Sequence, residues 1–325
     1  MTPRTGVIAV VGEALVDLVL EPDGNAATHL GGGSFNAART LGRLGLQPLF
    51  VGRLSRDSYG RALRAGLEES GVRLDGIIDT SDPTTFARVE VDADGVASYR
   101  FYIDGTSAPG LLPSDARAVM PAAPAAIHVG GLGLVLEPHA STIATLVAGA
   151  APSTLVFVDP NCRPAAIADP LAYRRRLAAI LARADVVKVS RDDLAWLEPD
   201  LPPLHAARRW LDRGPALILL TDGKRGATVL ASAGHLHIDG VRAEVIDTIG
   251  AGDAFGAAWL GAWVTDDLGP ADLTDLYAVV RAARFASLIA ARTCERPGAE
   301  PPRAVKVGPE WCVAGITPGT TSLAE

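Results

Sequence analysis

The chain has 325 residues, of which 48% are hydrophobic, and its formal net charge is −7. This length fits one large α/β domain or a main domain with a smaller appendage. The acidic balance argues against a general nucleic-acid binder, because such proteins present dense basic patches to the phosphate backbone. The 3 cysteines, at positions 162, 294 and 312, cannot all pair and lack zinc-knuckle spacing, which excludes a disulfide or zinc scaffold.

The apolar stretch near the N-terminus does not have the pattern of a targeting segment. Glu13 and Asp17 interrupt it, so neither a signal-peptide core nor a membrane span fits. We therefore expect a cytoplasmic protein with no membrane partner and no nucleic-acid partner.

Short apolar runs of strand length alternate with longer segments of helical period along most of the chain. This alternation is typical of parallel βαβ construction, in which helices cover both faces of a central sheet. The expected strands are residues 7–11, 48–52, 126–129, 155–159, 185–188, 216–220 and 227–230. The expected helices are residues 35–44, 59–70, 138–148, 171–182, 204–213, 254–265 and 273–292.

The segment 85–102 departs from this alternation. Its apolar and polar residues alternate around Asp94-Gly95, which is a strong signal for a β-hairpin. With residues 15–20 and 76–79, the hairpin is expected to form a small sheet that acts as a lid. The lid, at about 13–30 and 76–104, would be inserted in a single domain of residues 1–325. The alternative is an ordinary edge hairpin of the main sheet.

The most informative segment reads Asp-Thr-Ile-Gly-Ala-Gly-Asp and covers residues 247–253, between a strand-like run at 241–246 and an apolar helix. The N–H groups at a helix start bind anions, and Gly250 and Gly252 would allow a phosphate to approach the backbone. Asp253 either caps the helix or accepts a proton from a hydroxyl that attacks phosphorus. Asp247 would hold or orient a cation that screens the phosphates.

Two other phosphate-binding motifs fit the chain less well. A P-loop requires Ser or Thr after its Lys, but Lys224 is followed by Arg225. A dinucleotide fingerprint matches Gly250, Gly252 and Gly256 loosely, but the roughly 70 residues that follow are too few for the rest of such a domain.

A second glycine cluster, Gly31-Gly32-Gly33, precedes Ser34-Phe35-Asn36 and an expected helix. Three glycines in a row favour close approach by a ligand or unusual backbone angles. The simpler interpretation is a flexible turn with Ser34 as the N-cap. Asn36 both donates and accepts hydrogen bonds, which suits sugar hydroxyls.

These two clusters resemble the signatures of the ribokinase-like, or pfkB-type, carbohydrate kinase family. The segment 247–253 matches the C-terminal signature without a mismatch, and Gly31-Gly32 with Asn36 resembles the N-terminal one. Supporting matches follow the family's order along nearly the whole chain; they include Gly12-Glu13 with Asp17, Asp159-Pro160-Asn161 with Arg163, and Thr221-Asp222-Gly223 with Gly226. The resemblance implies a ribokinase-like three-layer α/β/α domain with a mostly parallel central sheet and a small β-sheet lid. It also implies ATP-dependent phosphorylation of a small sugar.

The resemblance further assigns roles to single residues. Asp253 would be the general base, and the N–H groups of Gly250, Ala251 and Gly252 would form an anion hole for the transferred phosphoryl group. The residues expected to bind the sugar are Asp17, Gly32, Gly33, Asn36, Arg100 and Arg163. Those expected to line the nucleotide site are Lys188, Ser190, Thr221, Gly223, Gly226 and Ser287. The cations implied are Mg²⁺, which accompanies ATP, and K⁺; the residues expected near them are Asp193, Asp247 and Thr248.

Two positions differ from the pattern of many family members. Ser190 and Asp193 stand where an Asn-x-x-Glu motif is common, which predicts an altered metal dependence. Ala286-Ser287 stands where an Ala-Asn pair is common near the adenine.

Shorter stretches predict the sugar. Residues 12–17, 159–163 and 99–102 resemble fructokinases more than ribokinases, so a primary hydroxyl of fructose is the first expectation. The 2-keto-3-deoxygluconate kinases share several of these residues, and Arg88 or Arg100 would pair with a substrate carboxylate, although solvated strand positions explain both arginines as well. Ribose or nucleoside kinases of the same family, and a catalytically silent sugar- or nucleotide-binding protein on the same fold, remain open. A homodimer through the lid is a further expectation.

Three other features are interpreted without a binding role. The Arg174-Arg175-Arg176 run is expected on a solvated helix face, and His235 and His237 at exposed strand positions. The stretch from Pro297 onward is expected to be an extended tail.

Overall fold

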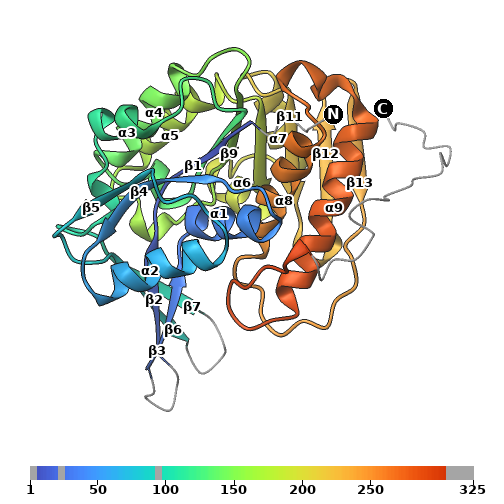
Figure 1. Cartoon of the computed structure of the whole chain (residues 1–325). Coiled ribbons are helices and arrows are strands. Elements are labelled where there is room, and N and C mark those ends of the chain that lie inside the picture. The colour runs from blue at the N-terminus through green and yellow to red at the C-terminus, as the bar shows by residue number, and fades with distance from the viewer. Residues whose placement is uncertain (1–5, 21–25, 92–96, 305–325) are drawn as a thin grey trace.

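A nine-stranded sheet forms the centre of the molecule (Figure 1). The structure is a computed structural model and describes residues 6–20, 26–91 and 97–304. The strand order is β13-β12-β11-β10-β9-β8-β1-β4-β5, and neighbours pair in parallel except at β11-β12 and β12-β13, which are antiparallel. The strands are β1 (Ile8–Val11), β4 (Leu49–Ser55), β5 (Ile77–Thr80), β8 (Ala126–Gly130), β9 (Leu155–Asp159), β10 (Val186–Ser190), β11 (Leu217–Thr221), β12 (Ala227–Ala231) and β13 (Gly234–Ile238).

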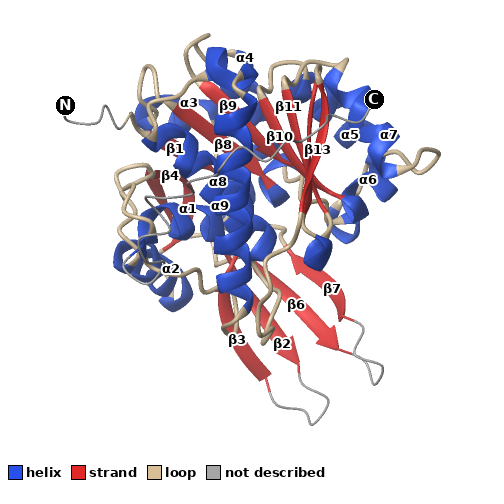
Figure 2. Cartoon of the chain, turned by 90° about the vertical axis from the view of Figure 1, so that its right-hand side faces the viewer, coloured by secondary structure: helices blue, strands red, loops and turns tan. Residues whose placement is uncertain are grey.

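Helices cover both faces of this sheet, which explains why its inner strands are apolar on both sides (Figure 2). The helices on one face are α1 (Gly33–Arg43), α2 (Ser58–Glu69), α8 (Ala251–Thr265) and α9 (Leu276–Cys294). Those on the other are α3 (Pro113–Val119), α4 (His139–Ala148), α5 (Pro170–Leu181), α6 (Arg191–Leu197) and α7 (Pro203–Leu211). None of the helices in the described ranges combines the length and apolar composition needed to cross a bilayer. The predicted three-layer α/β/α architecture is confirmed.

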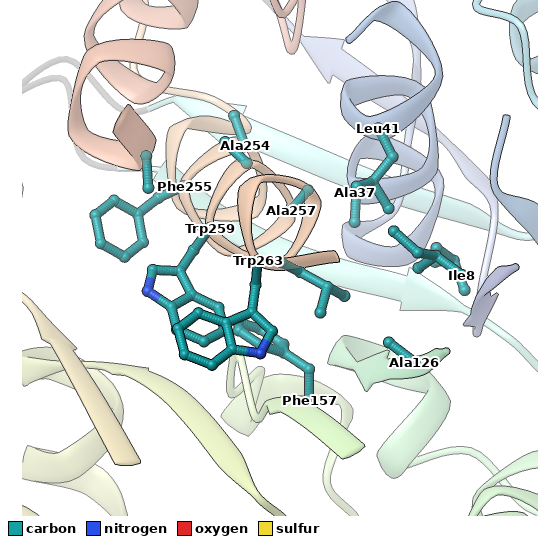
Figure 3. Close-up of a cluster of buried hydrophobic side chains, with 14 of the residues drawn as sticks. Ile8, Ala37, Leu41, Ala126, Phe157, Ala254, Phe255, Ala257, Trp259 and Trp263 are labelled. Atoms are coloured by element: carbon teal, nitrogen blue, oxygen red, sulfur yellow. The ribbon is translucent and has the colours of Figure 1, made fainter. Parts of the chain in front are cut away.

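The core beneath α8 is built on buried aromatic rings (Figure 3). The ring centroid of Phe157 lies 6.0 Å from that of Trp259, which stacks on Trp263 at 5.1 Å. On the α1 side of α8, a Cβ added to Gly261 would lie only 3.1 Å from the Leu41 side chain. The missing side chain therefore allows α1 and α8 to pack closely, and this packing fixes the site described below.

A separate four-stranded sheet, in the order β3-β2-β6-β7, projects from the main domain (Figure 2). Its strands are β2 (Leu15–Leu20), β3 (Ala26–Gly31), β6 (Phe86–Val91) and β7 (Ala97–Tyr102). β2 pairs in parallel with β6, while β2-β3 and β6-β7 are antiparallel. The predicted small sheet and hairpin are thus present, and the predicted Asp94-Gly95 turn lies outside the described residues.

Two strand predictions are wrong. Residues 76–79 do not join the small sheet, because β5 pairs with β4 at the edge of the main sheet, where Gly76 lies against the Phe50 carbonyl. The run 241–246 is an irregular segment rather than a strand. Ile246 donates its backbone N–H to Cys294 at the end of α9, and Val245 and Ile246 are exposed. Within the described residues this segment has no neighbouring strand to pair with, and an alternating sequence alone does not guarantee one.

The arginine run is also not a solvated face. Arg174 lies over the Trp196 ring and donates to the Trp196 carbonyl at the end of α6. Arg176 pairs with Glu137 and donates to the Leu134 carbonyl at 3.2 Å, and only Arg175 of the three is exposed. The expected tail is ordered as far as it is described, since Pro301 and Pro302 are buried; residues 305–325 lie outside the described ranges.

Candidate functional site

The first turns of α1 and α8 meet at one point, although they are more than 200 residues apart in the chain. Gly32 precedes α1 with φ 106°, and Gly250 precedes α8 with φ 74°, so each helix follows a left-handed residue that favours glycine. Asn36 donates from Nδ2 to Oδ2 of Asp253 at 2.9 Å. This bond joins the two sequence motifs that were predicted to act together.

Asp253 is buried and has a hydrogen-bond donor at each carboxylate oxygen. Asn161 donates from Nδ2 to Oδ1 of Asp253 at 2.9 Å, and Arg163 in turn donates to Oδ1 of Asn161 at 2.7 Å. Burial raises the pKa of Asp253 to about 7, and the nearby carboxylate of Asp159 adds to this rise. A carboxylate with such a pKa, held in one orientation, is suited to accept a proton near neutral pH.

A buried ion pair lies next to this carboxylate. Lys188 donates from Nζ to both oxygens of Asp159, at 3.1 and 3.0 Å. Burial by itself would lower the pKa of Lys188, but Asp159, Asp193 and Asp253 raise it above its ordinary value, so the ammonium stays charged. A Cβ on Gly252 would lie 3.0 Å from Nζ, which places the ammonium beside the backbone at the start of α8.

Gly33, the first residue of α1, leaves room beside Asp253. A Cβ on Gly33 would lie 3.0 Å from Nδ2 of Asn161 and 3.4 Å from Oδ1 of Asp253. Buried Glu13 holds this turn, accepting the N–H of Gly33 at 2.7 Å and that of Gly133 at 3.0 Å. Within the described part of the chain, the buried Oδ1 of Asn36 has no hydrogen-bond partner. It is an acceptor available to a ligand hydroxyl.

The small sheet contributes Asp17 to the same region. Burial raises the pKa of Asp17 to about 6, and Arg163 and His29 are close enough to lower it in part. A small buried cluster that includes Ala87 and Leu132 joins this side of the small sheet to the main domain. The face that carries Asp17 therefore faces the site.

Arg100 lies on the other face of the small sheet. The register pairs Asp17 with Ala87 and Ala87 with Phe101, whereas Arg88 pairs with Arg100. Because side chains alternate between faces along a strand, Arg100 is on the face opposite to Asp17, and it is exposed. The prediction that Arg100 reaches the sugar is not supported by this arrangement.

Four of the residues predicted to line the nucleotide site, Ser190, Thr221, Gly223 and Gly226, lie at or just beyond the ends of neighbouring strands. Ser190 and Thr221 are register partners at the ends of β10 and β11. Gly223 and Gly226 follow with φ 52° and 94°, where a side chain would be strained. A cavity of about 510 Å³ lies beside this turn and is lined by Arg191, Leu220, Asp222, Lys224, Arg225, Thr228, His237, Asp239 and Gly240. Ser287 is buried on α9 and donates to the Ala283 carbonyl of its own helix.

Two of the three residues predicted near cations, Asp193 and Asp247, use their carboxylates within the protein. Asp193 accepts the N–H of Cys162 at 2.7 Å and the hydroxyl of Ser190 at 2.7 Å. Asp247 accepts the N–H groups of Ile249 at 2.9 Å and Gly298 at 2.8 Å, and Thr248 is exposed. Among the described residues, no group of three His, Cys, Asp or Glu side chains is placed to hold a metal ion.

Sequence reasoning gave no role to several residues that build this site, namely Glu13, Asp159 and Asn161. The sequence did contain a signal that Asp159 and Asn161 belong to the site. Asp159 ends a predicted parallel strand and Asn161 follows it. Ligands bind beyond the carboxyl ends of such strands. Asn161 also has a φ of 40°, which the sequence did not reveal.

Comparison with known proteins identifies the family to which the chain belongs. Residues 7–305 match the pfkB family of carbohydrate kinases. A fructokinase of Rhizobium leguminosarum bv. trifolii is 33% identical over 80% of this chain and 81% of its own. The crystal structure of a Xylella fastidiosa fructokinase with bound ATP has a TM-score of 0.84 at 25% identity, covering 94% of this chain and 99% of that one. A Vibrio cholerae fructokinase, bound to fructose, ADP and calcium, has a TM-score of 0.80 at 24% identity, covering 91% and 94%. The chain belongs to the pfkB family of carbohydrate kinases.

Proposed function

We propose that this protein transfers the γ-phosphoryl group of ATP to a primary hydroxyl of fructose. The observation that carries the proposal is Asp253, a buried carboxylate whose pKa is raised to about 7, at the start of α8 directly after Gly250 and Gly252. The similar fructokinases support the choice of sugar.

In the proposed reaction, Asp253 removes the proton from the hydroxyl as its oxygen attacks the γ-phosphorus. A new O–P bond forms, the bond from the γ-phosphorus to the bridging oxygen breaks, and ADP leaves with that bond's electron pair. Asn36 and Asn161 orient the two oxygens of Asp253 during this step. The proton stays on Asp253 until the products leave.

The start of α8 stabilises the transferred group in this proposal. The N–H groups of Gly250, Ala251 and Gly252 and the positive end of the helix dipole would face its equatorial oxygens. Lys188 would add positive charge beside Gly252, where burial strengthens its effect.

On the sugar side, we propose that hydroxyls contact Asp17, the backbone at Gly32 and Gly33, Asn36 and Arg163. The unpartnered Oδ1 of Asn36 supports this choice, because a sugar hydroxyl would satisfy it. The nucleotide would lie along Ser190, Thr221, Gly223 and Gly226. The hydroxyl of Ser287 already donates within α9, so it would have only its acceptor lone pairs left for the nucleotide.

Among the described residues no group of three His, Cys, Asp or Glu side chains could form a cage for Mg²⁺, and Asp193 is engaged by Ser190 and Cys162. We therefore propose that Mg²⁺ arrives with ATP, held by phosphate oxygens and water, where it neutralises phosphate charge. A K⁺ ion near Asp247 and Thr248 is proposed on the family resemblance. We also propose a cytoplasmic location, which fits the free Cys162 and Cys294, and a homodimer through the small sheet.

The alternative of a 2-keto-3-deoxygluconate kinase rested on an arginine that pairs with the substrate carboxylate. Arg88 and Arg100, the two candidates, are on the face of the small sheet opposite to Asp17, which disfavours this alternative. A silent binding protein is disfavoured by the complete constellation of Asp253, Asn36 and Asn161.

The test is an ATP-consumption panel with fructose, ribose, 2-keto-3-deoxygluconate and adenosine, each in KCl and in tetramethylammonium chloride. Fructose should give the highest kcat/KM. Asp253→Asn should lower kcat by about 10²–10⁴-fold with nucleotide binding retained. Asp192→Asn, which changes an exposed acid at the start of α6, is the matched control and should behave like wild type. Turnover by Asp253→Asn near the wild-type rate would refute the mechanism, and ATP binding without turnover of any sugar would favour the silent protein.

A further inference from the structure

The segment 298–303, which we call the C-terminal strap, lies against α1 through a buried arginine. Arg39 donates from Nη1 to the Ala299 carbonyl at 3.0 Å and from Nη2 to Oε1 of Glu300 at 2.5 Å. Its Nε donates to Oγ of Ser70 at 3.3 Å, and the guanidinium lies 5.4 Å from the ring centre of Phe35. The side chain of Arg39 is only 9% exposed, so these partners replace its water.

The other side of the strap contacts the segment that precedes α8. Gly298 donates its N–H to Oδ2 of Asp247 at 2.8 Å. A Cβ on Gly250 would lie 2.5 Å from the Ala299 Cβ, so the strap is packed directly behind Gly250. The left-handed conformation of Gly250, which starts α8, is therefore supported from behind by the residue whose carbonyl Arg39 holds.

Arg39 and Asn36 are three positions apart on α1, so their side chains lie on the same side of the helix. Asn36 contacts Asp253 on α8, and Arg39 contacts the strap that supports Gly250. One face of α1 thus contacts the proposed base directly, through Asn36. It contacts the proposed anion hole indirectly, through Arg39 and the strap.

We infer that Arg39 is a positioning residue: through the Ala299 carbonyl and Glu300 it fixes the C-terminal strap behind Gly250 and so sets the anion hole relative to Asn36 and Asp253. The inference rests on the proposed kinase function. Small displacements matter here, because phosphoryl transfer depends on alignment of the reacting atoms.

Arg43 provides a matched control on the same helix. It pairs with Oε2 of Glu300 at 2.5 Å and donates to the Pro301 carbonyl at 2.8 Å, one turn farther from the site. Arg43 therefore holds the same strap without the contact to Ala299. A general loss of strap anchoring should appear in both arginine variants, whereas loss of Gly250 support should appear only when Arg39 is changed.

The experiment compares Arg39→Met, Arg39→Lys and Arg43→Met by steady-state kinetics and by hydrogen exchange of residues 249–254. Arg39→Met should lower kcat by about 10–100-fold, leave the KM for ATP within about threefold, and speed exchange at 249–254. Arg39→Lys, which keeps one donor group, should give an intermediate kcat, and Arg43→Met should remain within about threefold of wild type.

The exchange measurement needs no turnover, so it tests the inference even if the proposed function fails. A wild-type protein that phosphorylates no sugar would refute the function alone. Exchange at 249–254 unchanged in Arg39→Met, or an equal loss of kcat in Arg43→Met, would overturn the positioning role. If Arg39→Met does not fold, wild-type kcat and exchange in Arg39→Lys would overturn it.

Discussion

Asp253 illustrates how the surroundings of a single side chain change its pKa. Its carboxylate accepts two amide N–H bonds, which favour the charged form, yet burial and Asp159 raise its pKa to about 7. In the proposed reaction, a carboxylate with this pKa would be basic enough to take a proton near pH 7 and acidic enough to release it after the products leave.

The pH dependence of kcat/KM follows from this pKa. Asp253 must be deprotonated to act as the base, and its pKa is raised, so kcat/KM should fall about tenfold per pH unit below about 7. It should level off above that pH, and Asp17, with a pKa of about 6, should steepen the fall at lower pH. Initial rates from pH 5 to 9 at low fructose concentration test this. A flat profile across that range would contradict the assignment of the base.

Asp17 and Arg100 differ in which face of the small sheet they occupy. Asp17→Asn should raise the KM for fructose at least tenfold, because the amide has no negative charge and accepts fewer hydrogen bonds from sugar hydroxyls than the carboxylate does. Arg100→Ala is the paired variant on the exposed face and should change that KM by less than twofold. Titration of initial rate with fructose measures both. A large KM increase in Arg100→Ala would mean that the small sheet binds the sugar differently.

The face of a strand could not be predicted from alternation alone. A period of two shows that a strand has two faces, but it does not say which face meets the ligand. The register of β6 and β7 settles this for Arg100, because Arg100 pairs with Arg88 and not with Ala87. Alternation also does not show whether a strand has a neighbour: residues 241–246 alternate but pair with no strand among the described residues.

The helices and inner strands were predictable because each carries a strong local signal. β1, β8 and β9 are short, mostly apolar runs that are buried on both faces, and α8 follows Gly250 and is almost entirely apolar. Asp253 and Asn36 were predictable from their motifs. Their hydrogen bond, the Glu13 contacts and the Arg39 contacts join residues distant in sequence, and no local pattern encodes such pairs.

Asp57 links the start of α2 to the segment just before β6, where the chain re-enters the small sheet. It caps α2 by accepting the N–H of Gly60 at 2.7 Å, and it accepts the N–H of Thr84 at 2.8 Å just before β6. Burial alone would raise the pKa of Asp57, but these hydrogen bonds lower it to about 2. The charged carboxylate thus connects a main-domain helix to the segment that enters the small sheet.

Asp57→Ala should lower the free energy of unfolding by about 1–2 kcal/mol at pH 7. Because the pKa is lowered in the folded state, this stabilisation is complete above about pH 4 and is lost as the pH falls toward 2. Urea unfolding at pH 7 and pH 2.5 measures both values. Asp169→Ala removes the cap of α5 alone and is the control. Hydrogen exchange at 84–88 should rise only in Asp57→Ala; an equal rise in the control would exclude the proposed link.

The complete molecule should unfold as one unit, because its site joins the first and the last third of the chain. Asn36 and Asp253 meet across the α1 and α8 contact, and the strap closes the same region. Ligands that bind only the folded state stabilise it by about 2.7 kcal/mol at 100 times their dissociation constant. ATP and fructose together should therefore raise the midpoint of a single thermal transition by several degrees.

Differential scanning calorimetry measures this transition with and without ligands. Fructose without nucleotide and nucleotide without fructose are the controls, and each should give a smaller rise than the pair. Two separate transitions, of which only one responds to ligand, would show that the small sheet and the main domain unfold independently.

The position of α8 in the chain has a consequence for synthesis on the ribosome. Strands β1, β4, β8 and β9 are complete by residue 159, yet the helix that covers them with Trp259 and Trp263 begins only at residue 251. Helices α1 and α2 on the same face are already made by then, but the part of the face that α8 covers stays exposed while about 90 further residues are added, which takes several seconds at 5–20 residues per second. Nascent chains of that length should bind chaperones that recognise exposed apolar surface, and the release of α8 from the exit tunnel should end that binding.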